Sequence, residues 1–150
     1  MTYLEIGDWA LMQTAAQTVR TAVFIQEQGI APEDEWDAND ETALHAVLFD
    51  VNGQPLGNAR LLKHSTNVAK VGRMAVLKEA RGRGFGARLL QALLGEARRL
   101  GHREVRLSAQ CTAEPFYAAH GFRMEGEPFE EVGIPHVAMS LKMGAPPNLH

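Results

Sequence analysis

The residues whose types and spacing point most directly to chemistry lie at positions 81–86, where the sequence reads RGRGFG. Its three alternate glycines can adopt positive φ without a Cβ penalty, so the backbone amides can turn toward one point. The helical pattern that follows adds the unpaired N–H groups of its first turn and the positive end of its dipole. We therefore expect a cradle for a phosphate or pyrophosphate, with two arginines adding positive charge. Its residues are Arg81, Gly82, Arg83, Gly84, Phe85 and Gly86.

The spacing separates this loop from two other phosphate loops. A GxxxxGK[ST] loop needs Lys and then Ser or Thr after its last glycine, but Ala87 and Arg88 follow Gly86. A dinucleotide fingerprint needs G-x-G-x-x-G and an acidic residue at the end of the next strand, whereas Glu104 stands at the start of that strand. A glycine-rich connector with solvated arginines remains the purely structural alternative.

The elements that must position the loop are a strand before it and a helix after it. The apolar run Val68–Leu77 predicts the strand, and the pattern from Phe85 to near Gly101 predicts the helix. Val105–Ala109 predicts a second strand, which a helical crossover pairs in parallel with Val71–Leu77. The loop should therefore lie beyond the carboxyl end of a parallel strand, where such sheets bind ligands.

The remaining segments predict antiparallel strands around this unit. Asp8 is a predicted cap for a helix that ends near Gly29, and the six carboxylates of residues 31–41 predict a loop or short helix. Asn52-Gly53 is a strong hairpin signal. The other predicted elements are the strands Ala43–Val51, Leu56–Leu62, Phe122–Glu125 and Val137–Lys142 and the short helix Pro115–Ala119. We expect an α+β fold with a mixed, mostly antiparallel central sheet, helices on both faces and one parallel strand pair.

Composition excludes several classes of protein. A formal net charge of −3 over 150 residues offers no electrostatic footprint for nucleic acid. The chain shows no basic-then-apolar leader and no apolar run of about 18 residues, so we expect a cytoplasmic protein without membrane contact. The single cysteine, Cys111, excludes an internal disulfide and a Cys-rich metal site. Because no two histidines show short metal-ligand spacing, we expect no metal.

Two segments, in this order, resemble the GNAT (GCN5-related) family of N-acetyltransferases. Residues 81–86 match the family's R/Q-x-x-G-x-G/A loop, and residues 113–122 match its A-x-x-F-Y-x-x-x-G-F segment. The resemblance covers roughly residues 15–143 and is most like the ElaA-type branch, through Val23-Phe24, Glu27-Gln28 and Gly133-Ile134-Pro135-His136. It implies a GNAT fold in a single domain over residues 1–143, with residues 144–150 as a flexible tail.

The resemblance implies that the loop holds the pyrophosphate of acetyl-CoA, the co-substrate, and that the parallel strand pair splays around an acetyl-CoA slot. The backbone of Met74, Ala75 and Val76 would pair with the pantetheine arm and donate to the thioester oxygen. Gln110 and Phe116 would complete the cofactor site. Many relatives carry Asn where Gln110 stands, and Gln keeps the amide donor and acceptor on a longer stem.

Acyl transfer to an amine needs a donor for the leaving thiolate and a base for the amine. The resemblance points the hydroxyl of Tyr117 at the cofactor sulfur, so Tyr117 is the predicted acid; the alternative is that it packs with its hydroxyl at the surface. A free lysine amine has a pKa of about 10.4, so a base or a water relay must take its proton. We rank His136 first as base, then Glu27, then His45, for which a structural role is commoner.

Three arginines, Arg20, Arg60 and Arg73, each interrupt apolar surroundings. Partnered ion pairs or snorkelling side chains are the more frequent outcome, and clamping of a substrate carboxylate is the alternative. The carboxylates of residues 31–41 would suit a cationic acceptor, but a solvated segment is the default expectation.

The function expected from this resemblance is direct transfer of an acetyl group from acetyl-CoA to a primary amine of a small molecule or peptide, in the EC 2.3.1 class. One alternative is a non-catalytic acyl-CoA-binding sensor. Another is an acyl-homoserine-lactone synthase, for which this chain is short. A homodimer is expected on base rates alone. Nothing in the sequence names the amine.

Overall fold

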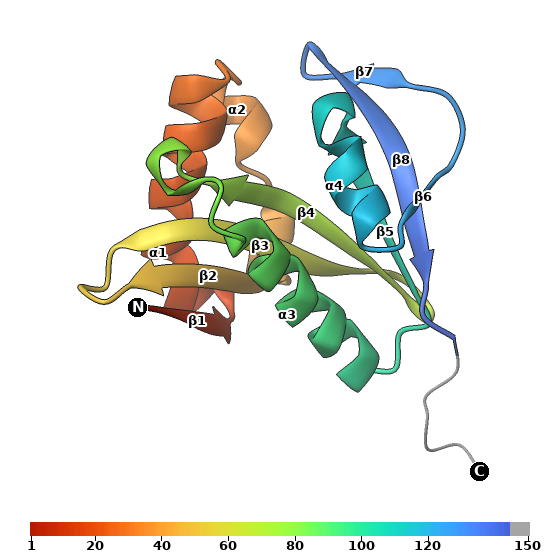
Figure 1. Cartoon of the computed structure of the whole chain (residues 1–150), viewed down its shortest axis with the longest axis horizontal. Coiled ribbons are helices and arrows are strands. Elements are labelled where there is room, and N and C mark those ends of the chain that lie inside the picture. The colour runs from red at the N-terminus through yellow and green to blue at the C-terminus, as the bar shows by residue number, and fades with distance from the viewer. Residues whose placement is uncertain (145–150) are drawn as a thin grey trace. The chain divides into compact units, whose positions relative to one another are not determined.

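The computed structural model describes residues 1–144 (Figure 1). By their contacts these residues form two compact units. The first unit comprises residues 1–62 and 71–95, and the second comprises residues 63–70 and the described residues from 96 to 144. Except for Gly144, the predicted tail lies outside the described residues. The single domain over residues 1–143 stays a prediction.

The first unit contains the N-terminal strands and the helices that flank them. In chain order the elements are β1 (Thr2–Gly7), α1 (Trp9–Arg20), a π-helix (Thr21–Glu27), α2 (Pro32–Glu35), a 3₁₀ helix (Ala38–Glu41), β2 (Leu44–Asp50), β3 (Pro55–Ser65), β4 (Val68–Val76), a 3₁₀ turn (Lys78–Ala80) and α3 (Phe85–Arg99). Strands β1, β2 and β3 pair antiparallel, and β4 lies next to β3. The later parts of β3 and α3 and the first part of β4 belong to the second unit.

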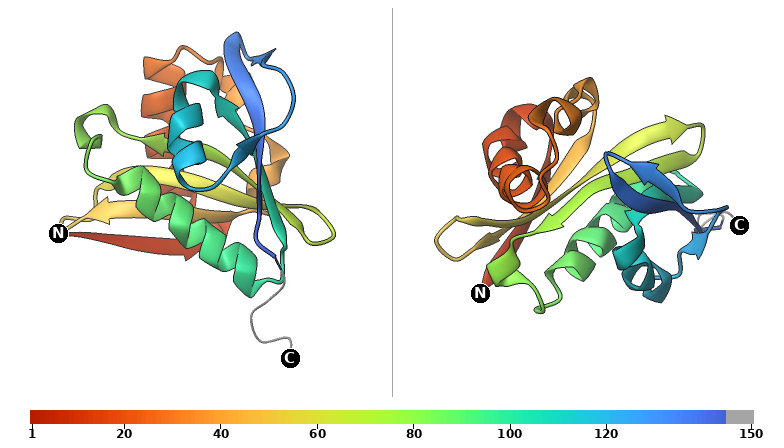
Figure 2. Two further views of the ribbon diagram at one scale, coloured as in Figure 1. Left: turned by 45° about the vertical axis from the view of Figure 1, so that its right-hand side comes forward. Right: turned by 90° about the horizontal axis from the view of Figure 1, so that it is seen from above.

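Different helices cover the two faces of these strands (Figure 2). Val47 of β2 packs with Met12 of α1. Its neighbour Leu48 faces the other way and is paired with Gly57 of β3. A Cβ at Gly57 would lie 2.9 Å from Cδ1 of Leu89, so α3 covers this second face and the glycine permits its close approach. Because α3 begins at the end of the glycine-rich loop, this contact helps to place the loop.

The second unit is built around β5 (Glu104–Gln110). This strand pairs in parallel with the start of β4 over Val68–Lys70 and antiparallel with β8 (Ile134–Lys142) along its whole length. The remaining elements are a 3₁₀ turn (Cys111–Ala113), α4 (Glu114–Ala119), β6 (Arg123–Met124) and β7 (Phe129–Glu131). Both β6 and β7 pair with β8.

The α+β class and the mixed, mostly antiparallel sheet, which has eight strands, are confirmed, and so is a parallel pair of strands. The parallel pairing joins Val68–Lys70 to Glu104–Arg106, however, and not the predicted segment Val71–Leu77. The predicted cap is also present, because Asp8 accepts a hydrogen bond of 3.0 Å from the amide of Leu11. Sequence reasoning missed β1 and β7, which exist through pairing with β2 and β8. It also missed the change from α-helix to π-helix after Arg20.

Candidate functional site

The glycine-rich loop has the backbone geometry of an anion cradle. Gly82 and Gly84 have φ angles of 81° and 79°, while Arg83 between them stays outside the left-handed region. Such alternation turns successive N–H groups toward one side. A helical hydrogen bond of 3.2 Å from the Arg88 amide to the Gly84 carbonyl opens α3, so the three amides in between have no acceptor within the helix. Phe85, the first residue of α3, is buried and fixes the loop to the core.

The first arginine of the loop is held by the protein itself. Arg81 Nε donates to the Val76 carbonyl at 3.0 Å, and its two Nη atoms donate to the two carboxylate oxygens of Glu27 at 2.8 and 2.7 Å. The hydrogen bonds from Arg81 lower the pKa of Glu27 below its usual value. Two residues predicted for separate roles therefore form one ion pair, and both loop arginines, Arg81 and Arg83, are exposed.

The predicted pantetheine partners, Met74–Val76, form the end of β4. The residue before them, Arg73, has a φ of 53°, which breaks the regular strand. Its carbonyl oxygen accepts a hydrogen bond of 3.0 Å from Asn58 Nδ2. Sequence reasoning missed this feature because the nearest glycine, Gly72, stands one position earlier.

In the second unit two predicted site residues lie side by side. Gln110 of β5 is directly opposite His136 of β8, so their side chains share one face of the sheet. The buried His136 ring has its Nδ1 atom 2.7 Å from the Ile134 carbonyl oxygen, which accepts its N–H. In the neutral ring Nε2 then carries the lone pair. This Nε2 atom lies 3.7 Å from Oε2 of Glu131.

Tyr117 is buried in α4 and not at the surface, with 7% of the residue exposed. Its ring packs edge-on against Phe116 at 5.0 Å and Phe122 at 5.9 Å between centroids. Burial raises the pKa of Tyr117 to about 12, so the hydroxyl keeps its proton at neutral pH.

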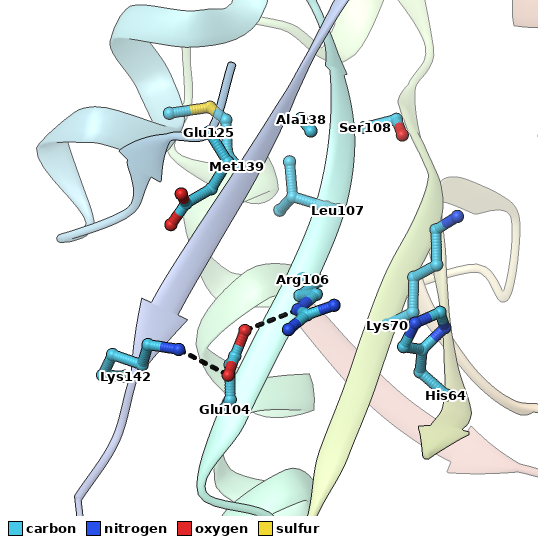
Figure 3. A pocket seen from close by; sticks show the side chains of 10 residues that line it. All are labelled: His64, Lys70, Glu104, Arg106, Leu107, Ser108, Glu125, Ala138, Met139 and Lys142. Carbon is cyan, nitrogen blue, oxygen red and sulfur yellow. Dashed lines mark hydrogen bonds and ion pairs between the residues drawn. The ribbon is translucent and has the colours of Figure 1, made fainter.

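Each unit also contains a cavity among its described residues. In the first, a cavity of about 290 Å³ lies beside Glu27, between the π-helix and residues 77–79. In the second, a cavity of about 490 Å³ lies over β4, β5 and β8 (Figure 3). Glu104 pairs there with Arg106 at 2.5 Å and with Lys142 at 2.6 Å. None of the predicted site residues lines this larger cavity, so its size alone does not make it the reaction site.

The expectation of a solvated segment at residues 31–41 is wrong for two of its six carboxylates, Glu35 and Asp40, which are buried. These two and the more exposed Asp37 bind arginines that come from α1, β3 and β4. The ion-pair expectation for these arginines is confirmed. We refer to this set as the arginine–carboxylate network; its members are Arg20, Glu35, Asp37, Asp40, Arg60 and Arg73.

A structural role for His45 agrees with its place against the network. The residue is fully buried on β2, and its Nε2 atom lies 2.8 Å from the Asp40 carbonyl oxygen. Burial lowers the pKa of His45 below its usual value.

Comparison with known proteins identifies the family. Residues 13–143 match the family described as the acetyltransferase (GNAT) domain, so the chain belongs to the GNAT family. This confirms the family prediction made from the loop and the Phe-Tyr segment.

Relatives and solved structures agree with this assignment. An uncharacterised N-acetyltransferase of Bacillus subtilis (strain 168), YjcF, is 36% identical over 122 residues, covering 81% of this chain and 86% of its own. The crystal structure of an acyl-CoA N-acyltransferase from Pseudomonas aeruginosa shows 31% identity and a TM-score of 0.83, with 94% and 99% of the two chains covered. Escherichia coli ElaA shows 27% identity and a TM-score of 0.84, with 95% and 100% covered.

Family membership implies an acyl-CoA co-substrate. The loop suits its pyrophosphate, since a Cβ at Gly82 or Gly84 would meet no heavy atom within 4 Å, so no protein atom crowds these two glycines. Within residues 1–144, no group of three or more His, Cys, Asp or Glu side chains is arranged to hold a metal ion. Nor does the described part of the chain contain a helix long and apolar enough to cross a membrane.

Proposed function

We propose that this protein is an acetyl-CoA-dependent N-acetyltransferase that moves the acetyl group directly to a primary amine of a small molecule or peptide. The observation that carries the proposal is the glycine-rich loop, in which left-handed Gly82 and Gly84 lead into the unpaired amides of α3. That backbone suits a pyrophosphate, and the family supplies the expectation of an acyl-CoA. Bound acetyl-CoA supplies an activated thioester.

Three further groups complete the cofactor site in this proposal. The backbone amides of Met74–Val76 pair with the pantetheine arm and donate to the thioester oxygen as it gains charge. Gln110 and Phe116 are the further cofactor contacts that the family resemblance implies.

Tyr117 acts on the leaving group. A thiol has a pKa of about 8.5, whereas burial raises the pKa of Tyr117 to about 12. The phenol therefore remains a donor at neutral pH, but complete proton transfer to the thiolate is uphill. Tyr117 stabilises the departing sulfur chiefly through a hydrogen bond.

His136 is the proposed base. Its Nδ1–H is engaged by the Ile134 carbonyl, which leaves the lone pair of Nε2 to accept a proton from the amine, directly or through a water. Glu27 is less suited to this task, because a carboxylate with a lowered pKa is a weaker base. We assign Glu27 to positioning Arg81 at the start of the loop.

The test is a thiol-release assay with acetyl-CoA against polyamines, amino acids, aminoglycosides and lysine peptides. Release with at least one amine supports the enzyme. Clear acetyl-CoA binding with no release from any amine would instead support the sensor.

Tyr117→Phe tests the role of the hydroxyl. Loss of one positioned donor lowers kcat by about 10- to 100-fold, with little change in KM for acetyl-CoA. The matched control is Tyr3→Phe, because Tyr3 is the other tyrosine of the chain and is 43% exposed on β1. Unchanged turnover in Tyr117→Phe would remove the role.

A further inference from the structure

A strained residue lies inside β4, directly before the backbone that the proposed function uses. Arg73 has a φ of 53°, and a non-glycine residue in this region persists only where its surroundings over-determine it. A glycine would adopt the same φ without strain, yet the glycine here stands beside the strained position, at residue 72. The arginine side chain must therefore contribute contacts that offset the strain.

Those contacts hold Arg73 from two directions. Its Nη2 atom donates to the Glu35 carbonyl oxygen at 2.9 Å and lies 3.2 Å from Oδ2 of Asp37, and its Nε atom lies 3.1 Å from Oε2 of Glu35. From the other side, the fully buried Asn58 donates to the Arg73 carbonyl oxygen at 3.0 Å. Both the side chain and the following peptide group are therefore tied to neighbouring elements.

The groups that hold Arg73 are themselves fixed. Glu35 accepts a hydrogen bond of 2.8 Å from Arg20 Nε, and Asp37 accepts two, of 2.8 and 2.9 Å, from Arg60. The Arg20 guanidinium also lies over two tryptophan rings, 5.6 and 4.9 Å from their centroids. The Arg20 and Arg60 side chains are 0% and 5% exposed, whereas that of Arg73 is 24% exposed. Arg73 is thus the most exposed of the three arginines in the arginine–carboxylate network.

We propose that Arg73 is a positioning residue for acyl transfer. Its guanidinium, held by Glu35 and Asp37, sets the left-handed bend in β4 and so the direction of the backbone amides of Met74–Val76. This inference rests on the proposed function, in which those amides donate to the thioester oxygen. Arg73 acts through the backbone and needs no contact with the substrate.

The decisive variants are Arg73→Gly and Arg73→Lys. Glycine keeps access to the left-handed φ but removes the anchor, so we expect kcat to fall by about 10- to 100-fold, as for a misdirected oxyanion donor. KM for acetyl-CoA should change by less than about threefold, because the pyrophosphate loop is untouched. Arg73→Lys keeps the positive charge but lacks the planar guanidinium group that binds two acceptors at once. Its kcat should therefore lie between those of Arg73→Gly and the wild type.

Asp40→Asn is the matched control. Asp40 binds Arg20 and Arg60 but not Arg73, so this variant weakens the same network away from the bend. We expect a lower Tm and a kcat within about twofold of wild type, when all variants are assayed well below their Tm. An equal loss of kcat in Asp40→Asn and Arg73→Gly would overturn the proposal, since the effect would then be general loosening of the network.

Amide hydrogen exchange at residues 74–76 separates this inference from the proposed function. Loss of the anchor should speed exchange there by about tenfold or more in Arg73→Gly, relative to both Asp40→Asn and the wild type. If the wild type transfers no acetyl group, the proposed function fails and exchange alone decides the positioning role. If the amides of residues 74–76 exchange in Arg73→Gly at the rate seen in the wild type, the positioning role is overturned.

Discussion

Two groups of ion pairs in this protein both lie within hydrogen-bonding distance but differ in how deeply they are buried. In the buried arginine–carboxylate network, Arg20 lies 2.8 Å from Glu35, and the two side chains are 0% and 3% exposed. On β5 and β8, Glu104 lies 2.5 Å from Arg106 and 2.6 Å from Lys142, whose side chains are 51% and 70% exposed. The shorter distances belong to the exposed group, so a short distance does not indicate a buried pair.

The pKa shifts show what burial changes. Burial raises the pKa of Glu35, against the opposing effect of nearby arginines, and burial also lowers the pKa of Arg73. Both shifts favour the neutral form, so desolvation outweighs attraction at these two residues. At the exposed group, hydrogen bonds from Lys142 and Arg106 lower the pKa of Glu104, which is the ordinary result of pairing. A network of this kind adds little net stability while complete, but removal of one member leaves a buried charge without its partner.

The largest expected effect is that of Arg20→Met. The variant leaves Glu35 and Asp40 buried without one of their cations and should lower the free energy of unfolding by about 3–5 kcal/mol. Urea denaturation of the variant and the wild type measures this difference in the free energy of unfolding. Arg106→Met makes the same substitution in the exposed group and should cost less than about 1 kcal/mol. Equal losses in the two variants would contradict the contrast between buried and exposed pairs.

A smaller loss in the free energy of unfolding should appear when the pH is lowered, because His45 becomes protonated. Because the pKa of His45 is lowered in the folded state, the unfolded chain takes up the proton first. The stabilisation is complete above the ordinary histidine pKa of about 6.5 and is lost as pH falls below it. Protonation would place a buried charge near Arg20 and Arg60, which oppose it.

The measurement for His45 is urea denaturation between about pH 7 and pH 5. His45→Gln keeps a donor toward the Asp40 carbonyl but cannot ionise, so the wild type should lose its stability advantage over this variant as pH falls. The comparison between the two proteins cancels the titration of Glu35, whose raised pKa acts in the opposite direction. A constant difference over this range would contradict the prediction.

Glu27→Gln tests a pair of intermediate exposure. The Glu27 and Arg81 side chains are 35% and 41% exposed, so the change in stability should be below about 1 kcal/mol. Because the pair holds the start of the loop, KM for acetyl-CoA should rise by about two- to fivefold, the factor to which 0.5–1 kcal/mol corresponds. A kcat loss of about a hundredfold with KM unchanged would instead support Glu27 as the base.

The smallest expected effect is that of Glu104→Gln. The exposed cations on either side remain hydrated when the carboxylate is neutralised, so unfolding should change by less than about 1 kcal/mol. That difference should shrink further near 1 M salt, where the Debye length is about 3 Å. A loss that persists at high salt would show that Glu104 behaves like a member of the buried network.

Features set by nearby residues were predictable from the sequence. The glycine-rich loop, the cap at Asp8 and the Phe116-Tyr117 segment each depend on spacing within a few residues, and together they led to the family and the fold class. Strand β1 was not predicted, because it depends on pairing with β2 further along the chain. Strand β7 pairs with β8 directly after it, but it comprises only three exposed residues and so shows no hydrophobic alternation. Burial of the hydroxyl-bearing ring of Tyr117 was also open until the packing was known.

The sequence by itself therefore determined the glycine-rich loop, the family and the α+β class, since alternate glycines and hydrophobic periodicity act locally. Only the tertiary structure decided how the charged residues are used. Arg20 meets Glu35 and Asp40 across 15 and 20 positions, and Arg81 meets Glu27 across 54. Composition cannot foresee such pairs, because the energy of a charge depends on its burial and on the partner that the fold brings within hydrogen-bonding distance.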